Sequence, residues 1–128
     1  MDTRGRHFLV ELFGCDPNPL NDAQALRSAL RAGAEAAGAR VVAEVFHPFA
    51  PHGVTGVVVI EESHFSIHTW PESRYAAVDF YTCGDAQARR AIELLARELK
   101  ARRAEVLEVG RGGAPEQALQ EQSRSHWL

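Results

Sequence analysis

Hydrophobic and polar residues alternate with a period of two near the start of the chain. Between His7 and Phe13, one face carries Phe8, Val10 and Leu12, and the other carries His7, Leu9 and Glu11. Such alternation predicts a β-strand with one buried face. Similar patterns predict further strands at residues 41–46, 54–60, 65–70, 75–81 and 105–109.

A helical period replaces this alternation in two segments. Residues 15–19 have the composition of a loop, after which Asn21 is the expected N-cap of the first helix, with Gln24 completing a capping box and Gly38 ending the helix. Its expected buried positions are Leu26, Leu30, Gly33 and Ala37. Asp85 is the expected cap of the second helix, whose buried positions are Ala88, Ile92, Leu95 and Leu99.

This order of elements predicts an α+β fold, a two-layer sandwich of a mainly antiparallel sheet with two helices on one face. With 128 residues, the chain is long enough to bury one hydrophobic core. We expect residues 1–110 to form a single domain. Residues 111–128, which are rich in Gly, Gln, Glu and Ser, are expected to form a flexible C-terminal tail.

Composition excludes several classes of protein. Apolar residues make up 45% and charged residues 24%, which are values of a globular protein. A net charge of -3 argues against nucleic-acid binding, and the longest apolar stretch, at residues 57–60, is far too short to span a membrane. No targeting segment is visible, and Cys15 and Cys83 show no CxxC pattern. We therefore expect a cytoplasmic protein with free thiols.

Residues with reactive side chains concentrate between positions 46 and 84. The segment has no GxSxG, GxxxxGK[ST] or GxGxxG motif, which argues against a serine hydrolase, a phosphate-binding loop and a dinucleotide fold. His64 and His68 share one face of a predicted strand, but they lie about 13 Å apart along it. We therefore expect no metal site.

The remaining feature is a serine at the turn between two predicted strands. It lies in EESHFSIHTWPE at residues 61–72, preceded by GRH at 5–7 and followed by TCG at 82–84. Together these motifs resemble the S-adenosylmethionine decarboxylase proenzymes of the small prokaryotic class, and the resemblance covers about residues 5–110. The block is long, so it is specific for that family.

The resemblance implies that the chain cuts itself between Glu62 and Ser63, giving a β chain of residues 1–62 and an α chain of residues 63–128. Ser63 then becomes a pyruvoyl group, which forms a Schiff base with the substrate amine and replaces pyridoxal phosphate. His68 matches the processing base, Thr55 matches its supporting hydroxyl and Cys83 matches the proton donor. A serine hydroxyl is a poor nucleophile, so a strained turn must bring the reacting atoms together.

The resemblance also implies a substrate and its binding residues. S-Adenosylmethionine would lose CO2 to give the decarboxylated aminopropyl donor of spermidine biosynthesis. Phe49 matches the aromatic residue that stacks on adenine, and Glu72 matches the carboxylate that holds the ribose hydroxyls. Trp70 is expected near both, and His7 and Glu11 are expected to border the site.

Two alternatives remain open. The chain departs from many relatives at Pro48, His52 and Glu61, so the same pyruvoyl mechanism could act on L-ornithine or L-arginine instead. From a different class, the chain could be an uncleaved, non-catalytic partner subunit, although Ser63 and Cys83 are both present. For the enzyme, the family implies a heterotetramer of two α and two β chains in which each site borrows residues from both protomers.

Overall fold

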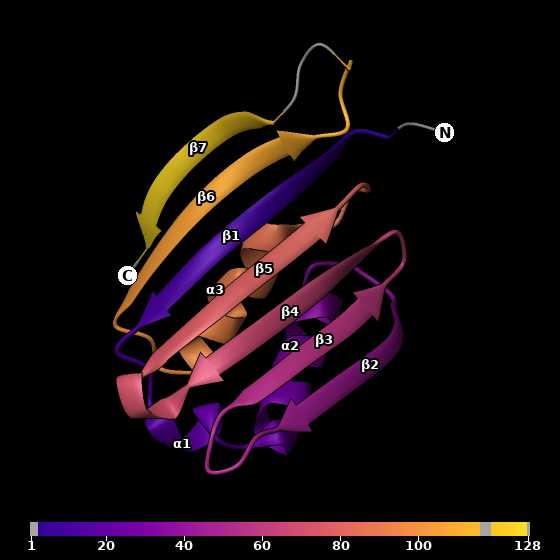
Figure 1. The fold of residues 1–128 in the computed structure, drawn as a ribbon. Coiled ribbons are helices and arrows are strands. Elements are labelled where there is room, and N and C mark those ends of the chain that lie inside the picture. Colours follow the sequence, from indigo (N-terminus) through magenta and orange to yellow (C-terminus); the bar gives the residue numbers. More distant parts are fainter. Residues whose placement is uncertain (1–2, 116–118, 128) are drawn as a thin grey trace.

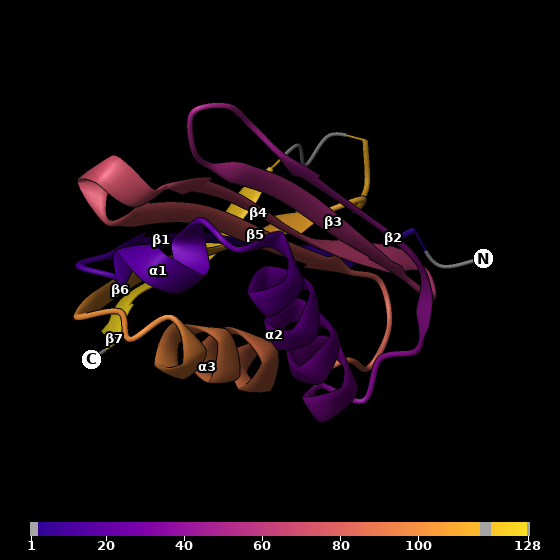
Figure 2. The same cartoon turned by 90° about the horizontal axis from the view of Figure 1, so that it is seen from below.

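The computed structural model describes residues 3–115 and 119–127 of the chain. They form one seven-stranded antiparallel sheet with helices packed on a single face (Figures 1 and 2). The predicted α+β two-layer sandwich is therefore confirmed. None of the helices in these residues is long and apolar enough to cross a membrane.

The elements follow one another with short connections. In chain order they are β1 (Gly5–Phe13), α1 (Pro17–Leu20), α2 (Ala23–Ala36), β2 (Val41–Pro48), β3 (Val54–Ile60), β4 (Ser63–Trp70), the 3-10 turn η1 (Pro71–Ser73), β5 (Tyr75–Thr82), α3 (Ala88–Glu98), β6 (Arg103–Arg111) and β7 (Gln120–Trp127). The strands lie in the order β2-β3-β4-β5-β1-β6-β7. Thus β4 and β5 lie near the middle of the sheet.

The hydrophobic core lies between the sheet and the helices α2 and α3. The predicted apolar positions of both helices are buried, and the rings of Phe65 and Phe80 meet at 5.1 Å in the sheet layer. Gly33 allows α2 to lie close to β4 and α3. A Cβ at this position would lie 3.0 Å from the Phe65 ring and 3.2 Å from the Ala91 carbonyl oxygen. Close packing on this face holds β4 and β5 rigidly in place.

Both predicted helix caps were wrong. Asp22, not Asn21, caps α2, and its carboxylate accepts hydrogen bonds from the backbone of Gln24 and Ala25. The Asn21 side chain instead accepts a bond from Gly53 N at 2.9 Å. Helix α3 has Gln87 at its N-cap position in place of Asp85, and no side chain caps it.

Two segments are more regular than predicted. Residues 17–20, expected as loop, form α1, because Asp16 caps the turn and two prolines suit its first positions. Strand β2 extends through Pro48, although the sequence suggested an earlier end. Pro48 is tolerated because β2 is an edge strand.

The prediction of a flexible tail was wrong for residues 120–127, which form strand β7 on the outer edge of β6. Most side chains of β7 are exposed, so the strand has no hydrophobic alternation to reveal it. It is held by backbone pairing with β6 and by Trp127, whose ring lies 4.6 Å from the Arg89 guanidinium. Residues 116–118 and 128 of the predicted tail lie outside the described residues.

The face of the sheet opposite the helices, which we call the open face, is uncovered (Figure 2). Strand register arranges its side chains in rows. One row holds His7, Tyr81 and His64; the next holds Leu9, Asp79 and Ser66; the third holds Glu11, Ala77, His68 and Thr55. The open face also exposes large apolar side chains, including Leu9, Val45 and Val59.

Candidate active site

The turn between β3 and β4 carries the predicted cleavage bond. Ile60 pairs with Ser63, so Glu61 and Glu62 alone reverse the chain direction. Glu62 has a φ of 67°, in the left-handed region that glycine or asparagine usually occupies. For a glutamate this backbone conformation costs about 1–2 kcal/mol. The turn is therefore strained at the residue that precedes Ser63.

Ser63 lies against the atoms that its predicted chemistry requires. Its hydroxyl donates to the carbonyl oxygen of Glu62 in a very short contact. The same hydroxyl oxygen accepts a hydrogen bond from Cys83 N at 3.1 Å. Because Cys83 directly follows β5, the sheet brings Ser63, the Glu62 carbonyl and the backbone of Cys83 together.

A cleft of about 720 Å³ lies beside this turn. The turn, the end of α2 and the loop before α3 all line it, through residues that include Gly38, Arg40, Glu61, Glu62, Gly84 and Gln87. The Glu62–Ser63 bond is therefore reachable from solvent on the side of the molecule where α2 ends and α3 begins.

His68 and Thr55 form a separate pair on the open face. They lie opposite each other on β4 and β3, with Thr55 Oγ1 and His68 Nδ1 3.0 Å apart. The two residues that the resemblance names for processing are therefore in contact. However, His68 is five residues from Ser63 along the same strand, which corresponds to roughly 17 Å at the rise of a β-strand.

Phe49 and Glu72 lie farther still from Ser63, beyond the other end of β4. Phe49 is half exposed, and its ring contacts His47 edge to face at 4.7 Å. The Glu72 carboxylate accepts a hydrogen bond from His52 Nε2 at 2.6 Å. The loop of residues 49–53 therefore carries both the exposed Phe49 ring and His52, which holds the Glu72 carboxylate.

Trp70 and Glu11 are brought together by Tyr75. The Tyr75 ring stacks on Trp70 at 5.3 Å, and its hydroxyl donates to Glu11 at 2.6 Å. Burial and the Glu11 carboxylate raise the pKa of Tyr75 to about 12, so its hydroxyl stays a donor. These residues form an aromatic and acidic wall at the same end of β4 as Glu72.

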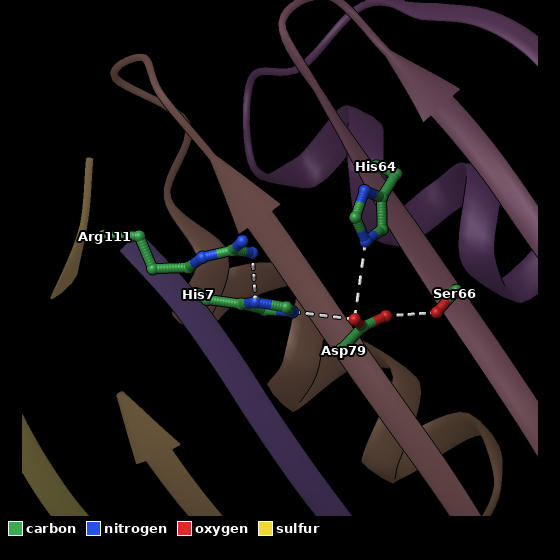
Figure 3. A network of polar contacts seen from close by, with 5 residues as sticks. All are labelled: His7, His64, Ser66, Asp79 and Arg111. Carbon is green, nitrogen blue, oxygen red and sulfur yellow. Dashed lines mark hydrogen bonds and ion pairs between the residues drawn. The ribbon is translucent and has the colours of Figure 1, made fainter. Parts of the chain in front are cut away.

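His7 belongs to a network centred on Asp79 (Figure 3). The Asp79 carboxylate lies 2.7 Å from His7 Nε2 and 3.4 Å from His64 Nε2, and it also accepts a short bond from Ser66. Burial alone would raise the pKa of Asp79, but the bonds from Ser66 and His7 and the nearby His64 outweigh it and lower that pKa. Asp79 is therefore an ionised carboxylate on the open face.

These residues are also the ones that could hold a metal ion. Among the described residues, only His7, His64 and Asp79 offer three ligand atoms within 4.8 Å of one another. Arg111 donates to His7 Nδ1 at 3.2 Å, which leaves the proton of that ring on Nε2, facing Asp79. The arrangement in the structure is thus a hydrogen-bond network.

Sequence reasoning named His7 but missed its partners Asp79, His64, Ser66 and Arg111. Period-two alternation alone places His64 and Ser66 on one face of their strand. Their meeting with His7, however, depends on the order in which β4, β5 and β1 pair. Arg111 was assigned to the flexible tail, although it is the last residue of β6.

Comparisons with known proteins agree with this architecture. A family model described as S-adenosylmethionine decarboxylase matches residues 6–112. An S-adenosylmethionine decarboxylase proenzyme of Shouchella clausii is 50% identical over 116 residues, covering 90% of each chain. One of Thermotoga maritima is 44% identical over 124 residues, covering 96% of this chain and 95% of the relative.

A solved structure supports the same assignment. The crystal structure of the adenosylmethionine decarboxylase of Aquifex aeolicus has a TM-score of 0.81 and 35% identity, and the match covers 92% of this chain and 98% of that one. The fold and the match over residues 6–112 define a decarboxylase, an enzyme of the carboxy-lyase class. The chain belongs to the S-adenosylmethionine decarboxylase family, as the sequence motifs indicated.

The lowered pKa of Asp79 predicts a pH-dependent contribution to stability. Because the folded-state pKa is the lower one, this stability is present above the ordinary aspartate value of about 3.9 and is lost as pH falls through the folded-state value. Asp79→Asn should lower the free energy of unfolding at neutral pH by about 1–3 kcal/mol. The difference from the unmodified chain should shrink below about pH 4.

Urea unfolding at several pH values measures this difference. Asp85→Asn is the matched control, because Asp85 is exposed and should change little. A difference between Asp79→Asn and the unmodified chain that stays constant down to pH about 3 would contradict the role given to Asp79.

Proposed function

We propose that this chain cleaves itself between Glu62 and Ser63 and then decarboxylates S-adenosylmethionine, using a pyruvoyl group made from Ser63. The observation that carries the proposal is the contact between the Ser63 hydroxyl and the carbonyl of Glu62, a residue held at a φ of 67°. The contact keeps the hydroxyl next to the carbonyl group whose carbon it must attack.

The cleavage chemistry uses atoms of the chain and one water molecule. Ser63 Oγ bonds to the Glu62 carbonyl carbon while the peptide C–N bond breaks, which leaves an ester and a free amine. A base then removes the α-proton of residue 63, and the Cβ–Oγ bond breaks to release the Glu62 carboxylate. Water replaces the nitrogen of residue 63, which leaves as ammonia, and the new N-terminus is a pyruvoyl group.

The base in this scheme is His68 of a second copy of the chain. Within one copy, His68 lies roughly 17 Å from Ser63 along β4, far beyond the reach of a proton transfer. Thr55 Oγ1, 3.0 Å from His68 Nδ1, fixes the orientation of the ring. We therefore propose that Ser63 of one protomer meets the His68–Thr55 pair of the other.

The open face supplies a surface for this pairing. It carries exposed apolar side chains, including Leu9 at 43% and Val45 at 68% exposure, among polar residues. Two open faces that pack around a two-fold axis can place the turn of one copy against the far end of β4 of the other. After cleavage the assembly is a heterotetramer of two α and two β chains.

The same arrangement completes the substrate site. Phe49, Glu72 and Trp70 lie far from their own Ser63, so they would meet the Ser63 of the partner protomer. Phe49 would stack on adenine, Glu72 would bind the ribose hydroxyls, and aromatic rings would attract the sulfonium cation. His7 and Glu11 border the site on β1. The product is the aminopropyl donor for spermidine biosynthesis.

The pyruvoyl group supplies a carbonyl that withdraws electrons from the substrate carbon as CO2 leaves. No metal and no pyridoxal phosphate are required. The chain's own residues bind the substrate, exclude water and provide the proton that replaces CO2. We assign that proton to the thiol of Cys83, whose backbone N–H holds Ser63 Oγ at 3.1 Å.

Two measurements test the function together. Intact-mass spectrometry of purified protein should show two fragments divided between Glu62 and Ser63, the second with a blocked N-terminus, and Ser63→Ala should remain whole. The release of CO2 should be much faster from S-adenosylmethionine than from L-ornithine or L-arginine. A chain that stays intact on long incubation is the outcome expected of a non-catalytic subunit and would contradict the proposal.

The strained turn predicts a further effect. Glu62→Gly should relieve the cost of the left-handed backbone and slow self-cleavage by about tenfold, because 1.4 kcal/mol corresponds to a factor of ten. Glu62→Ala keeps the strain and should cleave at nearly the original rate. Gel densitometry of freshly translated protein follows both rates, and equal rates for the two variants would contradict a role for strain.

A further inference from the structure

Tyr81 lies among charged and aromatic neighbours on the open face. It pairs with His7 on β1 and His64 on β4. Its ring lies 5.3 Å from the His7 ring and 6.0 Å from the His64 ring, and the Arg111 guanidinium lies 5.0 Å from its centre. The Asp79 network (Figure 3) holds His7 and His64 in place. It therefore also fixes the position of the two imidazole rings next to Tyr81.

The phenol leans along β5 toward Cys83 because Gly5 leaves space for it. A Cβ at Gly5 would lie 2.8 Å from the Tyr81 hydroxyl oxygen and 2.9 Å from the ring. Arg6 pairs with Thr82, so Gly5 is the nearest counterpart of Cys83 on the neighbouring strand. The hydroxyl over Gly5 therefore lies at the level of Cys83 in the sheet.

The electrostatics agree with this geometry. The pKa of Tyr81 is raised, chiefly by its hydrogen bond with the Cys83 side chain and then by burial. A phenol that keeps its proton beside sulfur acts as the donor of that bond. The bond is strongest when the sulfur carries a negative charge.

We propose that Tyr81 is a positioning residue for Cys83: its hydroxyl, seated over Gly5, orients the thiol and stabilises the thiolate left after proton transfer. This inference rests on the proposed role of Cys83. In that step the S–H bond breaks, a C–H bond forms at the carbon that has lost CO2, and sulfur keeps the electron pair. Tyr81 then donates a hydrogen bond to that sulfur and favours the transfer.

Alkylation of Cys83 tests the contact without relying on activity. The rate of carbamidomethylation by iodoacetamide, followed by peptide mass spectrometry over a range of pH, reports the thiolate of each cysteine. Cys15 should not be alkylated, because it is fully buried and burial raises its pKa to about 11. The measurement applies equally to the unmodified protein and to uncleavable Ser63→Ala.

Tyr81→Phe should slow the alkylation of Cys83 at a given pH by about tenfold, the effect of losing a hydrogen bond to a charged group. Gly5→Ala, which keeps the hydroxyl but displaces the phenol, should change the rate in the same direction. Ser28→Ala is the control, since it removes an exposed hydroxyl from α2, on the face of the sheet opposite the open face.

The outcomes separate this inference from the proposed function. An alkylation profile unchanged by both Tyr81→Phe and Gly5→Ala overturns the inference, whatever the enzyme does. With a shifted profile, the cleaved Tyr81→Phe enzyme should lose kcat while KM for S-adenosylmethionine changes little. An unchanged kcat overturns the role in proton transfer. Failure of the unmodified protein to cleave or to release CO2 counts against the proposed function instead.

Discussion

The length of strand β4 is the constraint on which the proposed chemistry depends. A β-strand rises by about 3.3 Å per residue, so Ser63 at its start and His68 near its end cannot share one reaction centre within a protomer. The buried side chains of β4, including Phe65, are packed between neighbouring strands and α2, which leaves the strand no freedom to bend. A site that needs both ends must therefore contain two copies of the chain.

The register of the sheet separates two kinds of chemistry along the open face. At the start of β4 lie the strained turn, Ser63, Cys83 and the row of His7, Tyr81 and His64. At its far end lie the His68–Thr55 pair and then the aromatic and acidic wall of Trp70 and Tyr75. The Asp79 carboxylate lies between the two groups and is ionised, so it anchors the histidines nearest the cleavage turn.

Sequence patterns were sufficient for the fold class and for the family. The first strand and the buried positions of α2 and α3 could be predicted because the burial of one face leaves a periodic pattern of apolar side chains in the sequence. Strand β7 could not be found in this way, because backbone pairing leaves no such pattern. The predicted cap of α2 was wrong because the Asn21 side chain accepts its hydrogen bond from Gly53 N, a partner 32 residues away in the sequence.

The site shows the same limit in a different form. The motif around Ser63 named candidate residues for the chemistry, but the sequence did not show which of them lie together within one protomer. Only the extended backbone of β4 reveals that Ser63 and His68 lie roughly 17 Å apart. Partners drawn from three strands, such as His7 with Asp79 and His64, likewise require the strand order of the folded sheet.

Co-expression of two inactive variants tests the shared site most directly. With distinguishable tags, a His68→Ala chain should stay intact alone but should be cleaved when it assembles with a Ser63→Ala chain, which supplies His68 and itself remains whole. A Ser63→Ala/His68→Ala partner is the control and should rescue nothing. Cleavage of the His68→Ala chain alone, or its absence in the mixed assembly, would contradict the account.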